Sequence, residues 1–198
     1  MSERDKGDYD KAIADFTQAI KLNTNYVAAY SDRGFAKTRK GDYDGALPDV
    51  AKAIQMNPAY APAYNHRGII KDYKKDYDDA LADYNMALKL EPKFWKTYQN
   101  IGDVKLEQKD YDSAITNYTQ ALKLEESDFW KAASYYGRGL AKIRKSDADG
   151  AISDFTSAIK LNPQYADAYS GRGNVKAAKS DDDGAMIDTR LFPIASPS

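Results

Sequence analysis

Small and aromatic side chains return along this chain at fixed intervals, separated by strongly polar stretches. The block at 41–46 (GDYDGA) recurs at 75–80 (KDYDDA) and at 109–114 (KDYDSA), a spacing of 34 residues. Tyrosines that each precede a glycine by four positions recur with the same spacing, except for one interval of 37 residues after Tyr98: Tyr30, Tyr64, Tyr98, Tyr135 and Tyr169. A helix–turn–helix unit has this length and cannot bury its apolar face alone, so the pattern predicts pairs of α-helices stacked as a solenoid.

This pattern resembles the tetratricopeptide repeat family, whose units carry an aromatic residue at position 4, Gly at 8, Ala at 20, an aromatic or apolar residue at 24, Ala at 27 and Pro at 32. In the unit 61–94 these positions hold Tyr64, Gly68, Ala80, Tyr84, Ala87 and Pro92. The resemblance implies an all-α fold, a right-handed α-α superhelix (solenoid) of helix–turn–helix repeats. It divides the chain into one array: a partial repeat at 1–26 (mainly helix B), repeats at 27–60 and 61–94, a lengthened repeat at 95–131, a repeat at 132–165, and a partial, degenerate repeat at 166–198.

Each unit is expected to contain two helices, A and B. Helix A is expected at 27–40, 61–74, 95–108, 132–145 and 166–179, and helix B at about 10–23, 44–57, 78–91, 112–125 and 149–162. Asp44, Asp78 and Asp112 stand where helix B begins and can accept hydrogen bonds from its free amides. Pro58 and Pro92 should end helix B, because proline lacks a donor and restricts the residue before it.

Charged residues replace apolar ones at two positions of most units. Position 7, usually apolar in the family, carries Arg, and position 23, often aromatic, carries Asp. The expected ion pairs between helices A and B are Arg33–Asp49, Arg67–Asp83, Arg138–Asp154 and Arg172–Asp188. The third unit has Ile101 and Asn117 at these places. We expect half-buried pairs that fix the geometry of the helix pair; the alternative is that both side chains are solvated.

The third unit is three residues longer than the period, and a Phe-Trp-Lys sequence occurs at both of its borders, at 94–96 and 129–131. One interpretation is a lengthened turn whose aromatic residues pack between neighbouring units. The other is an exposed aromatic ledge that binds a partner.

Both ends of the array are incomplete in sequence. Residues 1–26 supply little more than one helix B, and Pro193 falls inside the last expected helix and would truncate it. Repeat arrays normally need a polar capping helix at each end. The sequence is therefore either part of a longer array, or its ends stack on another copy.

The resemblance implies a concave groove lined by helix A that holds peptide segments. The groove residues expected by position are Asn65, His66, Ile69, Tyr73, Lys96, Gln99, Asn100, Asp103, Tyr136, Leu140 and Arg144. Tyr73 and Tyr136 are the expected anchors, because tyrosine offers a large contact area with little loss of entropy. The alternative is that these residues form an ordinary solvated helix face.

Composition narrows the function. The chain has 29 basic and 30 acidic side chains, which argues against a nucleic-acid binder. It has no cysteine, one histidine and no phosphate-binding glycine loop, so we expect no catalysis, no cofactor and no metal. No apolar stretch suits a membrane span or a signal peptide. The absence of cysteine fits the cytoplasm, which is the location expected. The function predicted is a non-catalytic adaptor that binds a protein or peptide ligand; the alternative is a structural module that forms a homo-oligomer through its terminal repeats.

Overall fold

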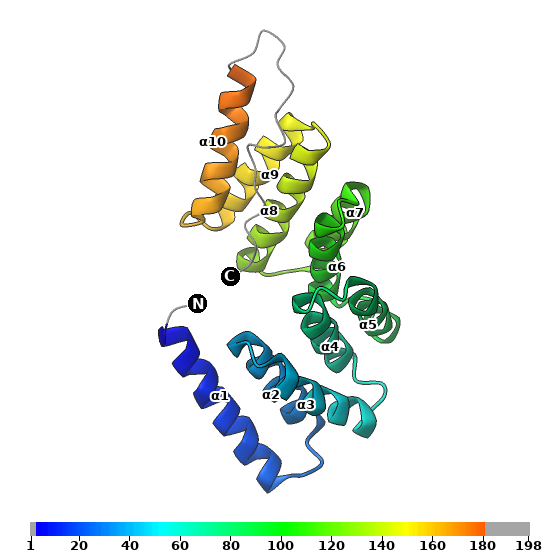
Figure 1. The fold of residues 1–198 in the computed structure, drawn as a ribbon. Coiled ribbons are helices and arrows are strands. Elements are labelled where there is room, and N and C mark those ends of the chain that lie inside the picture. The colour runs from blue at the N-terminus through cyan, green and yellow to red at the C-terminus, as the bar shows by residue number, and fades with distance from the viewer. Residues whose placement is uncertain (1–2, 181–198) are drawn as a thin grey trace. The chain divides into compact units, whose positions relative to one another are not determined.

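The computed structural model describes residues 3–180, which form ten α-helices and no strand (Figure 1). The helices are α1 (Glu3–Leu22), α2 (Val27–Lys40), α3 (Tyr43–Met56), α4 (Ala61–Tyr73), α5 (Tyr77–Leu90), α6 (Trp95–Glu107), α7 (Tyr111–Leu124), α8 (Asp128–Arg144), α9 (Ala148–Leu161) and α10 (Ala166–Ser180). The predicted all-α helical-repeat solenoid is confirmed. No helix within the described range is both long and apolar enough to cross a membrane.

The helices pack in the order of the chain. Within the repeats, α2 packs on α3, α4 on α5 and α8 on α9, and helix B of a repeat also packs on helix A of the next, as α1 does on α2 and α7 on α8. The described chain divides into two compact units, and the boundary in the sequence falls within α6. The N-terminal unit runs up to Thr97 and the C-terminal unit starts at Tyr98.

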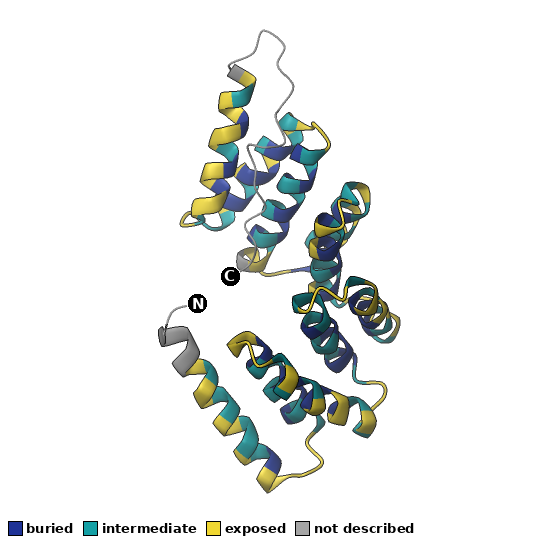
Figure 2. Cartoon of the chain, in the orientation of Figure 1, coloured by how far each residue is buried: buried dark blue, intermediate teal, exposed yellow. Residues whose placement is uncertain are grey.

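Close approach between paired helices depends on the glycine at position 8. A Cβ added at Gly68 would lie 2.5 Å from Cε1 of Tyr84, and one added at Gly139 would lie 2.8 Å from Cε1 of Phe155. Tyr84 and Phe155 are fully buried at position 24, and buried residues collect where paired helices face each other (Figure 2). A side chain in place of Gly68 or Gly139 would therefore push the two paired helices apart.

The turn between helices A and B places one residue in the left-handed region at position 15. Gly41 has a φ of 92°, which glycine adopts without steric cost. Lys75, Lys109 and Ser146 occupy the same place with φ values of 65°, 61° and 62°. These three residues are strained, because a Cβ disfavours this conformation.

The predicted helix caps were wrong by two residues. Helix B begins one residue earlier than expected, and its N-cap is the aspartate at position 16: Asp42 accepts from the amide of Gly45 at 2.9 Å, and Asp147 accepts from that of Gly150 at 2.9 Å. Asp44, Asp78 and Asp112 lie within the first turn instead. Two of these residues have a different role, since Asp44 and Asp112 pair with lysines of the next repeat.

Two helices are longer than the sequence indicated. α1 begins at Glu3 rather than near residue 10. α8 begins at Asp128, so the extra residues of the third unit lengthen the next helix A at its start rather than the turn before it. Trp130 lies in this added turn of helix and is 46% exposed.

Candidate functional site

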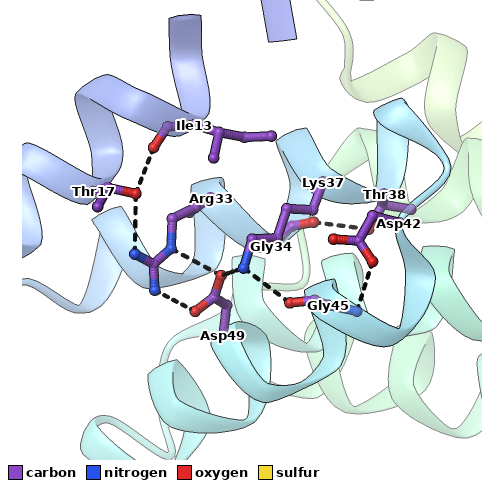
Figure 3. A network of polar contacts seen from close by, with 9 residues as sticks. All are labelled: Ile13, Thr17, Arg33, Gly34, Lys37, Thr38, Asp42, Gly45 and Asp49. Carbon is purple, nitrogen blue, oxygen red and sulfur yellow. Dashed lines mark hydrogen bonds and ion pairs between the residues drawn. The ribbon is translucent and has the colours of Figure 1, made fainter. Parts of the chain in front are cut away.

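A cluster of three charged side chains joins helices A and B in the first full repeat (Figure 3). Arg33 Nε donates to Asp49 Oδ2 at 2.9 Å, and Arg33 Nη2 donates to Asp49 Oδ1 at 2.5 Å. Lys37 Nζ lies 2.8 Å from Asp49 Oδ2 and also donates to the carbonyl of Gly45 at 3.0 Å. The buried carboxylate of Asp49 thus receives two cations, and its contact with Arg33 is bidentate, the strongest geometry for such pairs. The hydrogen bond to Asp49 raises the pKa of the Arg33 guanidinium.

The same cluster recurs in two other repeats. Asp83 accepts from Arg67 at 2.9 and 2.6 Å and lies 2.9 Å from Lys71 Nζ. The third example joins Asp154 to Arg138 at 2.9 and 2.7 Å and to Lys142 at 2.8 Å. Of the predicted pairs, the structure thus brings together Arg33–Asp49, Arg67–Asp83 and Arg138–Asp154, whereas Asp188, the expected partner of Arg172, lies outside the described residues.

The lysine of each cluster was not predicted from the sequence. Lys37, Lys71 and Lys142 stand at position 11, four residues after the arginine. Residues four apart on a helix share a face, so the recurrence of lysine at this spacing could have identified the third member. In the third repeat, where Asn117 replaces the aspartate, Lys105 lies 3.7 Å from Asp110 instead.

The arginine also reaches the preceding repeat. Arg33 Nη1 donates to Thr17 Oγ1 at 3.2 Å, and Arg138 Nη1 donates to Thr119 Oγ1 at 3.0 Å. Arg172 makes the same bond to Thr156 at 3.2 Å. The threonine is at position 25 of the previous helix B, so the guanidinium of Arg33 or Arg138 ties three helices together.

A second set of ion pairs links successive repeats. Lys74 Nζ lies 3.1 Å from Asp44 Oδ1, and Lys145 Nζ lies 2.6 Å from Asp112 Oδ1. Lys40 pairs with Asp10 in the same way. These lysines are at position 14, and the aspartates are at position 18 of the repeat before. Their side chains are largely exposed, so each pair contributes little and is screened by salt.

On the helix-A side of the N-terminal unit, α2 and α4 lie against each other and share a face. We call it the α2–α4 face; its residues are Ser31, Asp32, Phe35, Arg39, His66, Ile69 and Tyr73. The His66 ring stacks on Phe35 with centroids 4.7 Å apart, and His66 Nδ1 lies 2.9 Å from Ser31 Oγ. Burial lowers the pKa of His66 from 6.5 to about 4, so the ring is neutral at pH 7.

At the far end of this face, Tyr73 is fixed by two neighbours. Arg39 Nη1 donates to the Tyr73 hydroxyl at 3.0 Å, and the Tyr73 ring stacks on Tyr43 with centroids 5.5 Å apart. Arg39 Nε also donates to the hydroxyl of Tyr9 on α1 at 3.3 Å. These contacts leave the phenol half-buried and hold it in one orientation.

Three other groove candidates in this unit differ in exposure. Asn65 is buried, and its Oδ1 accepts from Thr97 Oγ1 at 3.0 Å, so its side chain joins α4 to α6 rather than facing a ligand. Ile69 is half-buried, and Lys96 is exposed on α6.

In the C-terminal unit, the groove candidates lie on α6 and α8. Gln99 Oε1 accepts from Ser134 Oγ at 3.3 Å, and Asp103 Oδ1 accepts from the Tyr118 hydroxyl at 2.6 Å. Asp103 is exposed, whereas Asn100, Leu140 and Arg144 are half-buried.

Tyr136, an expected anchor in this unit, is part of the packing. Its ring lies 5.0 Å from that of Tyr165 and 5.7 Å from that of Phe155, centroid to centroid. Burial raises the pKa of Tyr136. Its ring therefore fills space between α8 and α9, which leaves less of it available to a ligand than position alone suggested.

A cleft of about 260 Å³ opens between α1 and α2 in the N-terminal unit. Its lining residues are Asp15, Phe16, Ala19, Tyr26, Ala29 and Asp32. This cleft was not predicted from the sequence, because it depends on how α1 packs against α2. Within the described part of the chain, no group of three His, Cys, Asp or Glu side chains could hold a metal ion.

Stacked helix pairs of this kind define a helical-repeat scaffold, the class of protein whose repeats carry binding surfaces for other proteins. Family models described as TPR repeat or tetratricopeptide repeat match residues 2–41, 61–94, 96–128 and 136–189. The chain belongs to the tetratricopeptide repeat family. Proteins of this family bind protein or peptide partners and are generally non-catalytic.

Solved structures share this fold. YrrB, described as a TPR protein with an unusual peptide-binding site, has a TM-score of 0.65 at 23% identity, with 85% of each chain covered. TTC0263, a thermophilic TPR protein of Thermus thermophilus, has a TM-score of 0.72 at 19% identity, with 86% of this chain and 92% of that one covered. The Cut9–Hcn1 structure of the APC/C has a TM-score of 0.78 at 22% identity, with 85% of this chain and 33% of that one covered. A comparison with curated protein sequences finds no match.

Proposed function

We propose that this protein is a non-catalytic adaptor and that the α2–α4 face binds a peptide segment of a partner protein. The observation that carries the proposal is that the aromatic residues of this face are already fixed. Phe35 is stacked on His66, and Tyr73 is held by Arg39 and Tyr43. A surface whose side chains are ordered before binding loses less entropy when a ligand arrives.

The chemistry of the face suits an extended peptide. Neutral His66, together with Asp32 and the Tyr73 hydroxyl, offers hydrogen-bonding groups for peptide amides and carbonyls. Phe35 and Ile69 offer half-buried apolar contact beside them. Such a mixture of rigid aromatic anchors and polar groups is typical of sites that recognise peptides.

A displayed library of random peptides, selected against the immobilised protein, tests this proposal. Peptides recovered on the wild type are measured by fluorescence anisotropy against Phe35→Ala and Tyr73→Phe. We expect Phe35→Ala to weaken binding about tenfold or more, as loss of a central aromatic contact does. Tyr73→Phe keeps the stack on Tyr43 and removes only the hydroxyl, so a smaller loss is expected.

Two control variants locate the site. Trp130→Ala removes the exposed aromatic residue of α8, and Gln120→Ala changes an exposed residue of helix B. Neither should alter the affinity of the selected peptides. Peptides that lose affinity on Trp130→Ala but not on Phe35→Ala would place binding on the aromatic ledge and refute the α2–α4 face.

A further inference from the structure

Helix α1 lines the cleft that it forms with α2, and the α1 residues in this cleft stand at the positions by which a helix B contacts its own helix A. Counting back 34 residues from Asp49, Val50 and Ala53 gives Asp15, Phe16 and Ala19. In α3 these three positions face helix A of the same repeat: Asp49 binds its arginine and lysine, and Val50 lies against Gly34. In α1 the same positions line the cleft beside α2.

The cleft is acidic, and its acids lack a basic partner among the side chains that the structure describes, those of residues 8–128 and 130–179. Asp15 is exposed and Asp32 is half-buried, and neither forms an ion pair there. Burial in the cleft raises the pKa of the Asp32 carboxyl. By contrast, the aspartates at position 23 of α3, α5 and α9 each bind an arginine and a lysine.

The three helix pairs that carry a charged cluster show which helix such a face accepts. In each of them helix A contributes Arg-Gly at positions 7 and 8, followed by Lys at position 11. The arginine and lysine bind the aspartate, while the glycine lets the residue at position 24 come close. The face of α1, with Asp15 and Phe16, is therefore complementary to a helix that carries Arg-Gly-x-x-Lys.

Helix α10 carries this sequence as Arg172, Gly173 and Lys176. Arg172 is placed as in the other repeats, bonded to Thr156 and lying over the Tyr169 ring at 5.5 Å. Among the described residues, nothing lies within 4 Å of the place where a Cβ on Gly173 would be, whereas the other glycines at position 8 have a neighbour at 2.5–2.8 Å.

The residues that follow α10 carry Ala185 and Asp188 at positions 20 and 23, as a helix B does, but depart from that pattern further along. Thr189 stands at position 24, where α3, α5, α7 and α9 carry Val, Tyr, Tyr and Phe. Phe192 stands at position 27, where all four helices carry Ala, and Pro193 comes next. A large residue at position 27 and a proline beside it do not fit the close packing that Gly173 permits.

We propose that α10 of a second copy of this chain docks on α1 as the helix A of that repeat, with Arg172 bound to Asp15 and Gly173 lying over Phe16. The two surfaces are different, so the contact is heterologous. Heterologous contacts join copies head to tail and produce open chains, or rings where the rotation closes.

Sedimentation velocity on the 198-residue protein, from micromolar to near-millimolar concentration, tests the proposal. We expect concentration-dependent species larger than a dimer, which become smaller at high salt. Asp15→Arg should weaken association about tenfold or more, as charge reversal at a close pair does. Asp8→Arg makes the same change of charge at an exposed site on the same helix and should leave association unchanged.

Gly173→Ala separates docking from folding. Alanine has a higher helix propensity than glycine, and the site is open within the described part of its own chain, so the melting temperature should not fall. The added methyl group should nevertheless prevent close docking on Phe16 and abolish association. Asn174→Ala, on the neighbouring exposed position of α10, is the matched control.

Mixing two variants identifies the contact. Asp15→Arg and Arg172→Asp should each fail to associate alone, yet a mixture restores a complementary pair and should associate again. Asp188→Asn should have no effect on association. A protein that stays monomeric throughout, association that survives Asp15→Arg or Gly173→Ala, or failure of the mixture to recover would each overturn the proposal.

Discussion

Replacing Asp154 by Asn removes the carboxylate that holds α8 to α9. In the wild type this group accepts two hydrogen bonds from Arg138, at 2.9 and 2.7 Å, and lies 2.8 Å from Lys142. Its side chain is 3% exposed, and those of Arg138 and Lys142 are 17% and 20% exposed. The variant therefore leaves two cations side by side, largely shielded from water and without a counter-charge.

The magnitude follows from that exposure. Removing one partner from a fully buried ion pair costs about 3–5 kcal/mol. Both cations keep some contact with water here, which screens part of the loss, so we expect about 2–3 kcal/mol. For a domain of this size this corresponds to a melting temperature lower by about 4–12 °C. Asp83→Asn should cost less, because Arg67 is 30% exposed.

The third repeat provides the matched control. It carries Ile101 and Asn117 in place of the pair, and Ile101 is only 6% exposed. Introducing these residues together as Arg138→Ile and Asp154→Asn should restore the free energy of unfolding to within about 1 kcal/mol of the wild type, as apolar replacement of ion pairs often does.

Urea titrations followed by far-UV circular dichroism measure the three proteins side by side. Unfolding of Asp154→Asn at the same urea concentration as the wild type would refute a stabilising role for the carboxylate. A double variant no more stable than Asp154→Asn would refute the electrostatic cause, since the loss would then not arise from uncompensated charge.

Three further substitutions test separate features. Burial lowers the pKa of His66 from 6.5 to about 4, so the unfolded chain binds a proton at a higher pH than the folded one. The free energy of unfolding, measured by urea titration, should therefore fall by about 1–3 kcal/mol from pH 6.5 to pH 4 and stay level above pH 6.5. His66→Asn should remove this decline. Lys75→Gly should raise stability by about 0.5–1 kcal/mol, because φ is 65° there, and an unchanged midpoint would argue against strain. Gly139→Ala should lower it by about 1–3 kcal/mol through overpacking against Phe155, and an unaltered thermal melt would contradict this.

The fold could be predicted because its packing uses local, periodic residues. Gly68 and Tyr84 stand at fixed positions of the repeat, and these two positions come into contact when helices A and B pack as a pair. The pairing of Arg67 with Asp83 could be predicted for the same reason, because Asp83 lies on the side of helix B that faces helix A. The choice between two aspartates at each helix start, such as Asp42 and Asp44, could not be predicted, because either can accept from free amides.

The site was harder to predict because ring orientations depend on distant neighbours. Tyr136 and Tyr73 were both expected to be groove anchors, yet Tyr136 turns into a gap beside Tyr165 while Tyr73 is held by Arg39. Asn65 was expected to face a ligand, but its side chain accepts a hydrogen bond from Thr97 on α6. Position on a helix determines the face, whereas contacts from other helices determine which atoms remain available.

The repeated charges also act as a rule for which helices can pair. An Arg-Gly-x-x-Lys helix is matched to a helix with Asp followed by a large apolar residue, since charge and size are satisfied together only in that combination. A helix lacking the glycine is excluded by overlap, and one lacking the arginine leaves the buried aspartate uncompensated. The rule applies equally within a chain and between copies, because it depends on side chains rather than on connectivity. The acidic face of α1 and the basic face of α10 are therefore compatible for the same physical reason that α8 pairs with α9.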